Sequence, residues 1–436
     1  MKILVVLPDL PYPLESGGNQ AAFSMLEAMS QEHQVSLVCR GSKNAVSKQF
    51  KKALPNVELI FFPYPGSKED NPYPTLGFGG LRFKLTRYFA ASFRRKYYRF
   101  LEKNRDAQLD APEAARRHSQ LALAAKQFNP NHAFFGFVGD LCTKGYDAVQ
   151  VEFFEMLPVI YYLPGNIYKI FVHHELNYIR SAGEIALFPD KTPDDKAAWA
   201  RERDAELSML SHFNHIITLT GTDRELLQQA LPDVKIDASP AVVKTKGPLP
   251  FTPCGKELVF TGSASHYPNL DGLLWFCQEV LPLIREQDPE FKVHVTGKWA
   301  QNLQESLIKL APELVFDGFV EDLSAFLNGK ISIIPIRIGS GMRMKALDAI
   351  QASSPIVTTH KGIEGQMFTT EEDCLIFSDA TGFAQSVLRL SAQESLQENL
   401  ARHAFEKLSQ SYNPEEMIGR RMDLYRQIEN RNNQPL

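Results

Sequence analysis

The chain has 436 residues, 44% hydrophobic and 22% charged, and its 47 Lys and Arg against 51 Asp and Glu give a formal net charge of −4. This composition excludes a disordered, collagen-like or coiled-coil protein, and it lacks the basic excess of a dedicated nucleic-acid binder. The length favours two or three domains. Five scattered cysteines without a CxxC pair indicate a reducing compartment and no disulfide framework, so we expect a cytoplasmic protein.

The N-terminal part of the chain alternates short apolar runs with helical patterns. Residues 3–7 form an apolar run of strand length, and further runs occupy 35–40 and 57–63. Buried strands that alternate with helices predict a parallel sheet covered on both faces. No run approaches the ~20 apolar residues that cross a bilayer, so any membrane contact is expected to be peripheral.

An insertion interrupts this first α/β unit at about residues 66–130. Within it, residues 82–105 carry nine basic and seven aromatic side chains, with Glu102 as the single acid. Two interpretations stay open for this segment. It is either an amphipathic helix whose aromatic face packs on the core, or a peripheral contact with an anionic acceptor or with the inner face of the membrane.

The same alternation restarts after a linker at 244–256, which holds three Pro and two Gly in thirteen positions. It consists of a helical pattern at 269–287 and of apolar runs at 257–262, 291–297, 314–320, 331–336 and 355–359. The predicted domains are therefore 1–245 and 255–405. A helical tail at 406–436 follows, for which packing back on the first domain is one arrangement.

Two glycine-containing loops suit anionic ligands. Gly17-Gly18 lies between a strand and a helix, where backbone amides and the helix N-terminus attract negative charge. A tight turn into the helix is the structural alternative for that pair. In the second domain, the loop Gly339-Ser340-Gly341 follows a strand and precedes a helix.

Cations and an acid surround this second loop. Arg337 and Arg343 flank it, and the helix that follows carries Lys345 and Asp348. Glycines with cations at the carboxyl end of a strand predict a phosphate-binding corner of an open α/β sheet. Asp348 is suitably placed for the two hydroxyls of a ribose. The alternative is that Arg343, Lys345 and Asp348 form a solvated helix face.

These motifs resemble a known family. The strand–glycine–helix start, the segments FTGSASHYPNLDGLLWFCQEVLP, DGFVEDL and PIRIGSGMRMKALDAIQASSPIVTT, and KGIEG are similar to glycosyltransferases of the GT-B fold, in particular family 4 of retaining, nucleotide-sugar-dependent enzymes. The resemblance is strong over 257–377 and moderate over 1–40 and 146–180. It implies an α/β protein with two Rossmann-like parallel-sheet domains facing across a cleft. The C-terminal domain would hold the donor and the N-terminal domain the acceptor, with no cofactor besides the nucleotide-diphosphate sugar.

The resemblance assigns donor contacts by position. Asp348 falls where relatives have the second glutamate of an E-x7-E pattern, which bonds the donor ribose, and Ser340 replaces the first glutamate, near the donor sugar. The backbone at Phe319 and Val320 matches the segment that meets the nucleobase.

The Arg and Lys that usually meet the donor diphosphate are absent from TGSASHYPNLDG, which offers Ser263, Ser265, His266 and Asn269 instead. We therefore expect Arg337, Arg343, Lys345 and backbone amides of the two glycine loops to bind the diphosphate.

The resemblance also marks a strand end in the first domain. The segment at 168–180 reads as a strand that runs out into His173-His174-Glu175, where relatives carry a histidine close to the donor sugar and acceptor. His174 is the first candidate for this catalytic position and His173 the second. Glu152 and Arg180 are candidates for acceptor contacts.

Motifs of other enzyme classes are missing from the sequence. It has no D-x-D at a strand end, no HExxH, no P-loop and no G-x-S-x-G, so we expect neither a catalytic metal nor a hydrolase or NTPase site. The predicted function is transfer of a sugar from a nucleotide-diphosphate donor to a saccharide or lipid-linked acceptor, with retention and without a metal. A catalytically inactive GT-B partner protein and a nucleotide-sugar isomerase are the alternatives.

Overall fold

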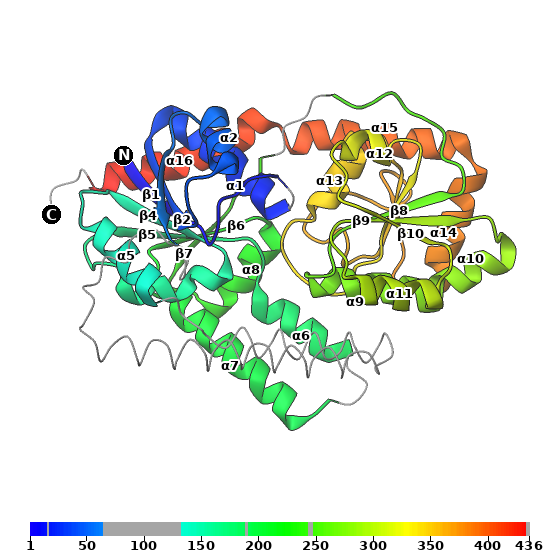
Figure 1. The fold of residues 1–436 in the computed structure, drawn as a ribbon, viewed down its shortest axis with the longest axis horizontal. Helices are drawn as coiled ribbons and strands as arrows, with labels where there is room; N and C mark the ends of the chain where they lie inside the picture. The colour runs from blue at the N-terminus through cyan, green and yellow to red at the C-terminus, as the bar shows by residue number, and fades with distance from the viewer. Residues whose placement is uncertain (15–16, 64–131, 188–190, 243–246, 433–436) are drawn as a thin grey trace, which may run out of the picture.

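The chain folds into two α/β domains that lie side by side, each built on its own parallel sheet (Figure 1). The computed structural model describes residues 1–14, 17–63, 132–187, 191–242 and 247–432. The insertion predicted between the third and fourth strands, with its basic aromatic segment, falls outside the described residues. The predicted fold class of two Rossmann-like parallel-sheet domains is confirmed.

The N-terminal domain has a seven-stranded parallel sheet with the order β3-β2-β1-β4-β5-β6-β7. Strand β1 lies inside the sheet, between β2 and β4, and its residues Ile3 to Val6 are fully buried, as a strand covered on both faces requires. The strand order reverses at β1, and ligands of open α/β sheets bind at such reversal points. The strands are β1 (Lys2–Val6), β2 (Gln34–Arg40), β3 (Glu58–Phe62), β4 (Ala148–Glu152), β5 (Tyr168–His173), β6 (His215–Thr218) and β7 (Lys235–Ala238).

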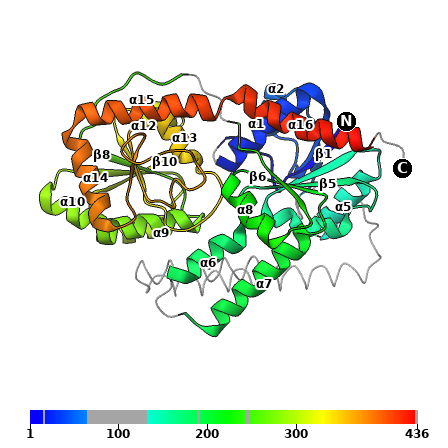
Figure 2. The same cartoon turned by 180° about the vertical axis from the view of Figure 1, so that it is seen from behind.

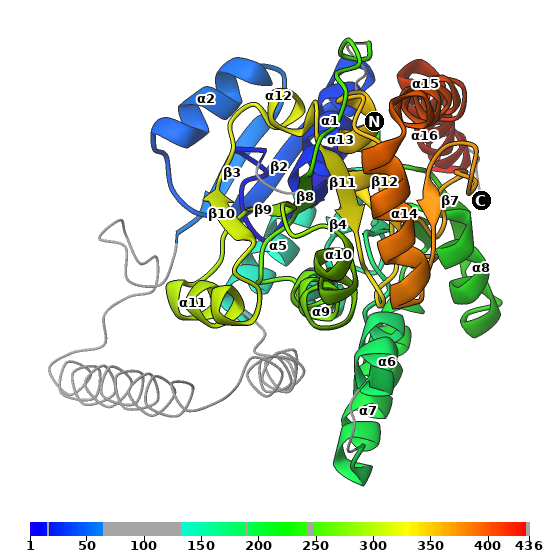
Figure 3. The same cartoon turned by 90° about the vertical axis from the view of Figure 1, so that its right-hand side faces the viewer.

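Side-chain caps define where several helices of this domain begin. The Asn44 side chain accepts a hydrogen bond from the Ser47 amide at 2.9 Å, and the Thr192 hydroxyl accepts one from the Asp195 amide at 3.2 Å. Such caps satisfy amides that the first helical turn leaves unpaired. The helices are α1 (Gly17–Glu32), α2 (Ala45–Ala53), α5 (His132–Cys142), the 3₁₀ helix η1 (Phe154–Tyr162), α6 (Asn177–Leu187), α7 (Pro193–Leu210) and α8 (Gly221–Ala230). Figure 3 shows α6 and α7 projecting away from the sheets.

The C-terminal domain has a six-stranded parallel sheet with the order β10-β9-β8-β11-β12-β13. Its strands are β8 (Glu257–Thr261), β9 (Lys292–Thr296), β10 (Leu314–Gly318), β11 (Ile331–Ile334), β12 (Ile356–Thr358) and β13 (Leu375–Ile376). The strand order reverses again at β8, the first strand of this domain. Both domains therefore have a reversal point, and ligands bind at the carboxyl ends of the strands there.

The helices of this domain depart from the sequence prediction at one place. The continuous helix expected at 269–287 contains a π-helical segment, because Pro282 has no amide hydrogen and its ring crowds the carbonyl of residue 278. The helices are α9 (Tyr267–Trp275), the π segment η2 (Phe276–Val280), α10 (Leu281–Gln287), α11 (Gln301–Leu310), α12 (Leu323–Leu327), α13 (Met344–Gln351), α14 (Ala380–Ala392) and α15 (Glu394–Ser411).

The chain returns to the N-terminal domain at its end. Helix α15 packs on the C-terminal domain, and α16 (Pro414–Asn432) follows it end to end along the back of the N-terminal domain (Figure 2). The break lies at Asn413, whose side chain accepts hydrogen bonds from the amides of Glu415 and Glu416 at 2.9 and 3.3 Å. Buried Met417, Met422, Tyr425 and Ile428 join α16 to the core around β1. The tail predicted for 406–436 thus begins inside α15, and its packing on the N-terminal domain starts at α16.

The second half of the predicted linker lies against the C-terminal domain. Gln397 of α15 accepts a hydrogen bond from the Cys254 amide at 2.8 Å and donates one to the Cys254 carbonyl at 3.1 Å.

All five cysteines are free and buried. Among the helices that the structure describes, none is both long and apolar enough to span a bilayer.

Candidate functional site

A cleft of about 710 Å³ lies between the two domains, at the carboxyl ends of both sheets. Its N-terminal wall comes from the start of α1 and from the loop after β5. Its C-terminal wall comes from the loops after β8, β10 and β11 and from α13. The predicted site residues that line it are Gly17, Gly18, His174, Ser263, Phe319, Val320, Ser340, Arg343, Lys345 and Asp348.

The loop between β11 and α13 requires glycine where it approaches the other domain. Gly339 and Gly341 have φ of +118° and +79°, in the region that side chains other than glycine rarely adopt. A Cβ at Gly341 would also lie 2.2 Å from the His174 carbonyl oxygen. Gly339 and Gly341 do not line the cleft, but they set the path of the loop that does. Gly341 also allows the C-terminal domain to approach the backbone of His174 at the end of β5.

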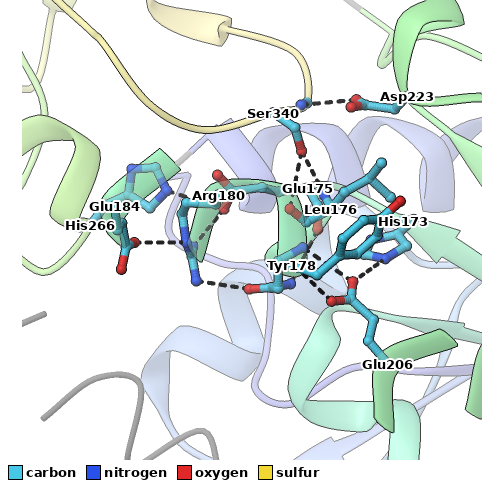
Figure 4. Close-up of polar contacts among 12 residues, drawn as sticks. His173, Glu175, Leu176, Tyr178, Arg180, Glu184, Glu206, Asp223, His266 and Ser340 are labelled. Carbon is cyan, nitrogen blue, oxygen red and sulfur yellow. Dashed lines mark hydrogen bonds and ion pairs between the residues drawn. The ribbon is translucent and has the colours of Figure 1, made fainter. Parts of the chain in front are cut away.

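Polar contacts join the glycine loop and the loop after β8 to the N-terminal domain (Figure 4). The Ser340 hydroxyl accepts a hydrogen bond from the Leu176 amide at 2.6 Å, and the Gly341 amide donates to Asp223 at 2.9 Å. His266 Nε2 lies 3.3 Å from Glu175 Oε2. Burial raises the pKa of Asp223. These contacts fix the position of the glycine loop relative to both sheets.

Lys345 and Asp348 lie on one face of α13, three residues apart. Lys345 Nζ donates to Asn269 Oδ1 at 2.7 Å and lies 4.9 Å from the centre of the Phe260 ring. Burial and the nearby charge of Arg343 lower the pKa of Lys345 to about 7. Burial raises the pKa of Asp348 to about 7. Both groups are thus close to their protonation midpoint at neutral pH, and a bound anion would favour the charged form of Lys345.

Arg343 immediately precedes α13, and its side chain turns back over the glycine loop. Its Nη1 donates to the carbonyl oxygens of Ser340 and Gly341, the latter at 2.9 Å. Within the described part of the chain, Arg343 Nη2 is buried without a hydrogen-bond partner. A buried guanidinium with a free donor is suited to an anionic ligand.

His174 and Glu152 form a pair at the edge of the N-terminal sheet. His174 Nε2 lies 2.8 Å from Glu152 Oε2, and the imidazole stacks on the Phe153 ring with 4.3 Å between centres. Glu152 is 3% exposed and does not line the cleft. The structure therefore places Glu152, predicted to contact the acceptor, behind His174.

His173 points away from the cleft, since neighbouring residues of a strand face opposite sides. Its Nε2 lies 2.8 Å from Glu206 Oε1, in the buried interior between β5 and α7. Glu206 also accepts hydrogen bonds from the amides of Asn177 and Tyr178 at 3.1 and 2.9 Å, and so caps the start of α6 (Figure 4). Of the two candidate histidines, only His174 lines the cleft.

Arg180 and Arg337 do not line the cleft, and each is paired with acidic side chains. Arg180 Nη1 donates to Glu175 Oε2 at 2.6 Å, and its Nε lies 3.3 Å from Glu184. Arg337 forms a two-point contact with Asp271 at 3.1 and 2.6 Å. Arg180, predicted to contact the acceptor, is therefore paired with carboxylates of the protein itself. The same holds for Arg337, which was predicted to contact the diphosphate.

Glu175 lines the cleft and was not a candidate from the sequence beyond its place after the two histidines. Although burial opposes it, the charges of Arg180 and His266 hold the pKa of Glu175 below its usual range, so the carboxylate is ionised. Its Oε1 is buried and has no hydrogen-bond partner among the described residues. The sequence offered no signal for this residue, because its partners lie in other elements.

Two parallel-sheet domains whose carboxyl edges meet at one cleft define the GT-B class of proteins. The fold is shared with TarM at a TM-score of 0.66, 11% identity and coverage of 97% of this chain and 98% of TarM. It is shared with sucrose-phosphate synthase from Thermosynechococcus elongatus at 0.63, 13% identity and coverage of 98% and 99%. A structure of HepE from Anabaena in complex with UDP and glucose gives 0.61, 10% identity and coverage of 98% and 99%.

Each of the sequence comparisons covers less than half of the chain. Residues 255–393 match the family of glycosyl transferases group 1. An uncharacterized 44.6 kDa protein in the cps region of Klebsiella pneumoniae is 27% identical over 170 residues, which are 37% of this chain and 44% of that protein. The match thus spans less than half of that relative. The chain has the GT-B fold and resembles these proteins, with the match to the glycosyl transferase family located in the domain that carries Arg343, Lys345 and Asp348.

Proposed function

We propose that the protein transfers a sugar from a nucleotide-diphosphate donor to a saccharide or lipid-linked acceptor. One observation carries the proposal. Arg343, Lys345 and Asp348 line one wall of the interdomain cleft, and His174 lines the other. Anion-binding cations, a carboxylate suited to a ribose and an imidazole are the groups that such a transfer needs in one place.

The C-terminal wall would hold the donor nucleotide. Asp348 would accept hydrogen bonds from the ribose hydroxyls, and Arg343 with Lys345 would bind the diphosphate. The start of α1 at Gly17 adds the positive end of a helix from the other side of the cleft. Phe319, 56% exposed at the end of β10, offers a ring on which a nucleobase would stack.

The reaction that we propose breaks the bond between the anomeric carbon and the diphosphate and forms a bond from that carbon to an acceptor oxygen. Retention places the new bond on the face that the diphosphate leaves. The acceptor hydroxyl would give its proton to the departing phosphate, whose negative charge Arg343 and Lys345 stabilise without a metal. His174 would orient the donor sugar or the acceptor at the reacting carbon.

The comparisons support the choice of substrates. The HepE structure contains UDP and glucose, and a structure of a TarM variant from S. aureus contains UDP, α-GlcNAc-glycerol and fondaparinux. The cps region of the Klebsiella relative supports a role in polysaccharide biosynthesis. UDP-sugars are therefore the first donors to test, and we propose a cytoplasmic site of action, at the inner face of the membrane if the acceptor is lipid-linked.

The test is a melting-temperature panel with UDP, GDP, dTDP and ADP and their sugars, followed by release of the nucleoside diphosphate in the presence of saccharide acceptors. A ligand at about 100 times its Kd adds about 2.7 kcal/mol to the free energy of unfolding. One nucleotide family should raise the melting temperature, and Arg343→Ala should abolish that shift while the matched surface variant Arg389→Ala retains it.

Two outcomes would overturn the proposal. Nucleotide binding without release of a nucleoside diphosphate from any donor would favour the alternative of an inactive GT-B partner protein. A donor sugar converted to its epimer in the absence of an acceptor would favour an isomerase.

A further inference from the structure

We infer that Tyr425 of the C-terminal helix α16 is a positioning residue for His174, acting through Gln150 and Glu152. The orientation of His174 affects the reaction only if His174 lies beside the reacting sugar, so this role of Tyr425 rests on the function proposed above. Helix α16 contributes no residue to the lining of the cleft.

A continuous series of hydrogen bonds leads from α16 to the cleft. The Tyr425 hydroxyl donates to Gln150 Oε1, and Gln150 Nε2 donates to Glu152 Oε1 at 2.7 Å. The second carboxylate oxygen, Oε2, lies 2.8 Å from His174 Nε2. Gln150 and Tyr425 are fully buried and Glu152 is 3% exposed, so water does not compete for these bonds.

The chemistry of the four groups fixes the direction of every bond. An ionised carboxylate only accepts, so Gln150 must turn its NH₂ group toward Glu152 and its carbonyl oxygen toward Tyr425. Burial raises the pKa of Tyr425, which keeps the hydroxyl protonated and able to donate. At the other end, the same carboxylate requires a proton on His174 Nε2. With that proton turned toward the carboxylate, an uncharged imidazole would carry its lone pair on Nδ1.

The imidazole is held at two points. Glu152 fixes Nε2, and the Phe153 ring lies almost parallel to the imidazole, with 9° between the two planes. Phe153 takes a backbone φ of +69°, which is rare for an aromatic residue and which the surrounding structure must maintain. If Tyr425 no longer held Gln150, the Glu152 carboxylate would lose its fixed partner and His174 its orientation.

Packing and a second anchor fix the Tyr425 hydroxyl itself. Met422 and Ile428 of α16 are buried in the core around β1. The buried Arg421 donates from Nε to the Ser239 hydroxyl at 2.9 Å and from Nη2 to the Ser239 carbonyl at 3.1 Å. The helix that returns from the C-terminal domain thus delivers a hydroxyl at a defined place behind the cleft.

The experiment compares Tyr425→Phe with Met422→Leu in the full-length protein. Both residues are buried in α16, but only Tyr425 belongs to the hydrogen-bond series. Removing the hydroxyl should lower kcat for nucleoside diphosphate release about threefold to thirtyfold, with the donor KM unchanged within about twofold. Met422→Leu should change neither constant. In a Glu152→Gln background, Tyr425→Phe should have no further effect on kcat.

A second measurement does not depend on activity. The ¹⁵N–¹H spectrum of the histidine rings, with His174 assigned by its loss in His174→Gln, should show the proton on Nε2 in the wild type and a mixture of tautomers in Tyr425→Phe. An unchanged kcat and an unchanged His174 tautomer in Tyr425→Phe would overturn the positioning role of Tyr425. An equal loss of kcat in Met422→Leu would overturn it as well. Absence of turnover in the wild type would instead contradict the proposed function, and the ring spectra would still decide the role of Tyr425.

Discussion

Donor binding should be strongest near pH 7 and should weaken on both sides. Asp348 must be ionised to accept hydrogen bonds from a ribose, and Lys345 must be protonated to bind a diphosphate. The structure gives both groups a pKa of about 7, raised in Asp348 and lowered in Lys345 by the same burial. The fraction of protein with both groups charged therefore passes through a maximum at neutral pH.

The two pKa values set the size of the effect. Asp348 and Lys345 also attract each other, so they titrate as a coupled pair. Well away from neutral pH, the fraction of molecules with both charges falls about tenfold for each further pH unit, because only one of the two groups is then still changing its charge. The affinity should follow this fraction. Below pH 7 the loss comes from protonation of Asp348, and above pH 7 it comes from deprotonation of Lys345.

Isothermal titration calorimetry with UDP-glucose between pH 5 and pH 9 would measure this dependence, because the diphosphate of a nucleotide sugar does not titrate in that interval. Asp348→Asn should flatten the acid side of the profile alone, and Lys345→Met the alkaline side alone. The control Glu321→Ala removes a carboxylate from the same cleft and should keep the maximum. An affinity that is constant from pH 5 to pH 9, or a profile that neither variant alters, would refute this reasoning.

Further predictions concern the glycine loop, metal ions and the insertion. Gly341→Ala should destabilise the protein by about 2–4 kcal/mol and abolish nucleotide binding, whereas Gly145→Ala, at a similar φ of +75° but with open space around it, should cost only about 1 kcal/mol in urea unfolding. EDTA should leave nucleoside diphosphate release unchanged within about twofold, since cationic side chains are proposed to neutralise the diphosphate; a loss that Mg²⁺ or Mn²⁺ restores would contradict this. Replacing Arg94, Arg95 and Lys96 with Glu should weaken sedimentation with anionic liposomes if the insertion contacts membranes, and unchanged sedimentation would remove that interpretation.

The fold was predictable because its strands are buried on both faces and are separated by recognisable helices. Runs such as 3–7 and 331–336 correspond to β1 and β11. The break in the helix expected at 269–287 was not anticipated, although Pro282 stood in the sequence as its cause. Local composition predicts elements well, whereas the exact hydrogen-bond register inside a helix depends on its packing.

That several candidate residues meet at one cleft was predictable where these residues are close in sequence. Arg343, Lys345 and Asp348 reach the cleft together because one loop and one helix carry them. Contacts between distant segments left no signal of that kind. Asp271 pairs with Arg337 across 66 residues.

The sequence also did not show which of His173 and His174 lines the cleft. His173 turns inward because Glu206, 33 residues further along the chain, offers a buried carboxylate. Tyr425 lies 275 residues from Gln150, and only the return of the chain as α16 brings them together. These residues are joined by tertiary packing, which a single sequence does not reveal.

Proton NMR of the anomeric centre would judge the proposed reaction. The donor selected by the melting-temperature panel is incubated with full-length protein and an oligosaccharide acceptor, and the anomeric proton coupled to phosphorus is followed in time. We predict that this signal disappears with the wild type, that a new glycosidic signal with the donor's anomeric configuration replaces it, and that Arg343→Ala leaves the donor intact. A donor that stays intact with the wild type in every combination, or one that is converted to its epimer, would contradict sugar transfer in this cleft.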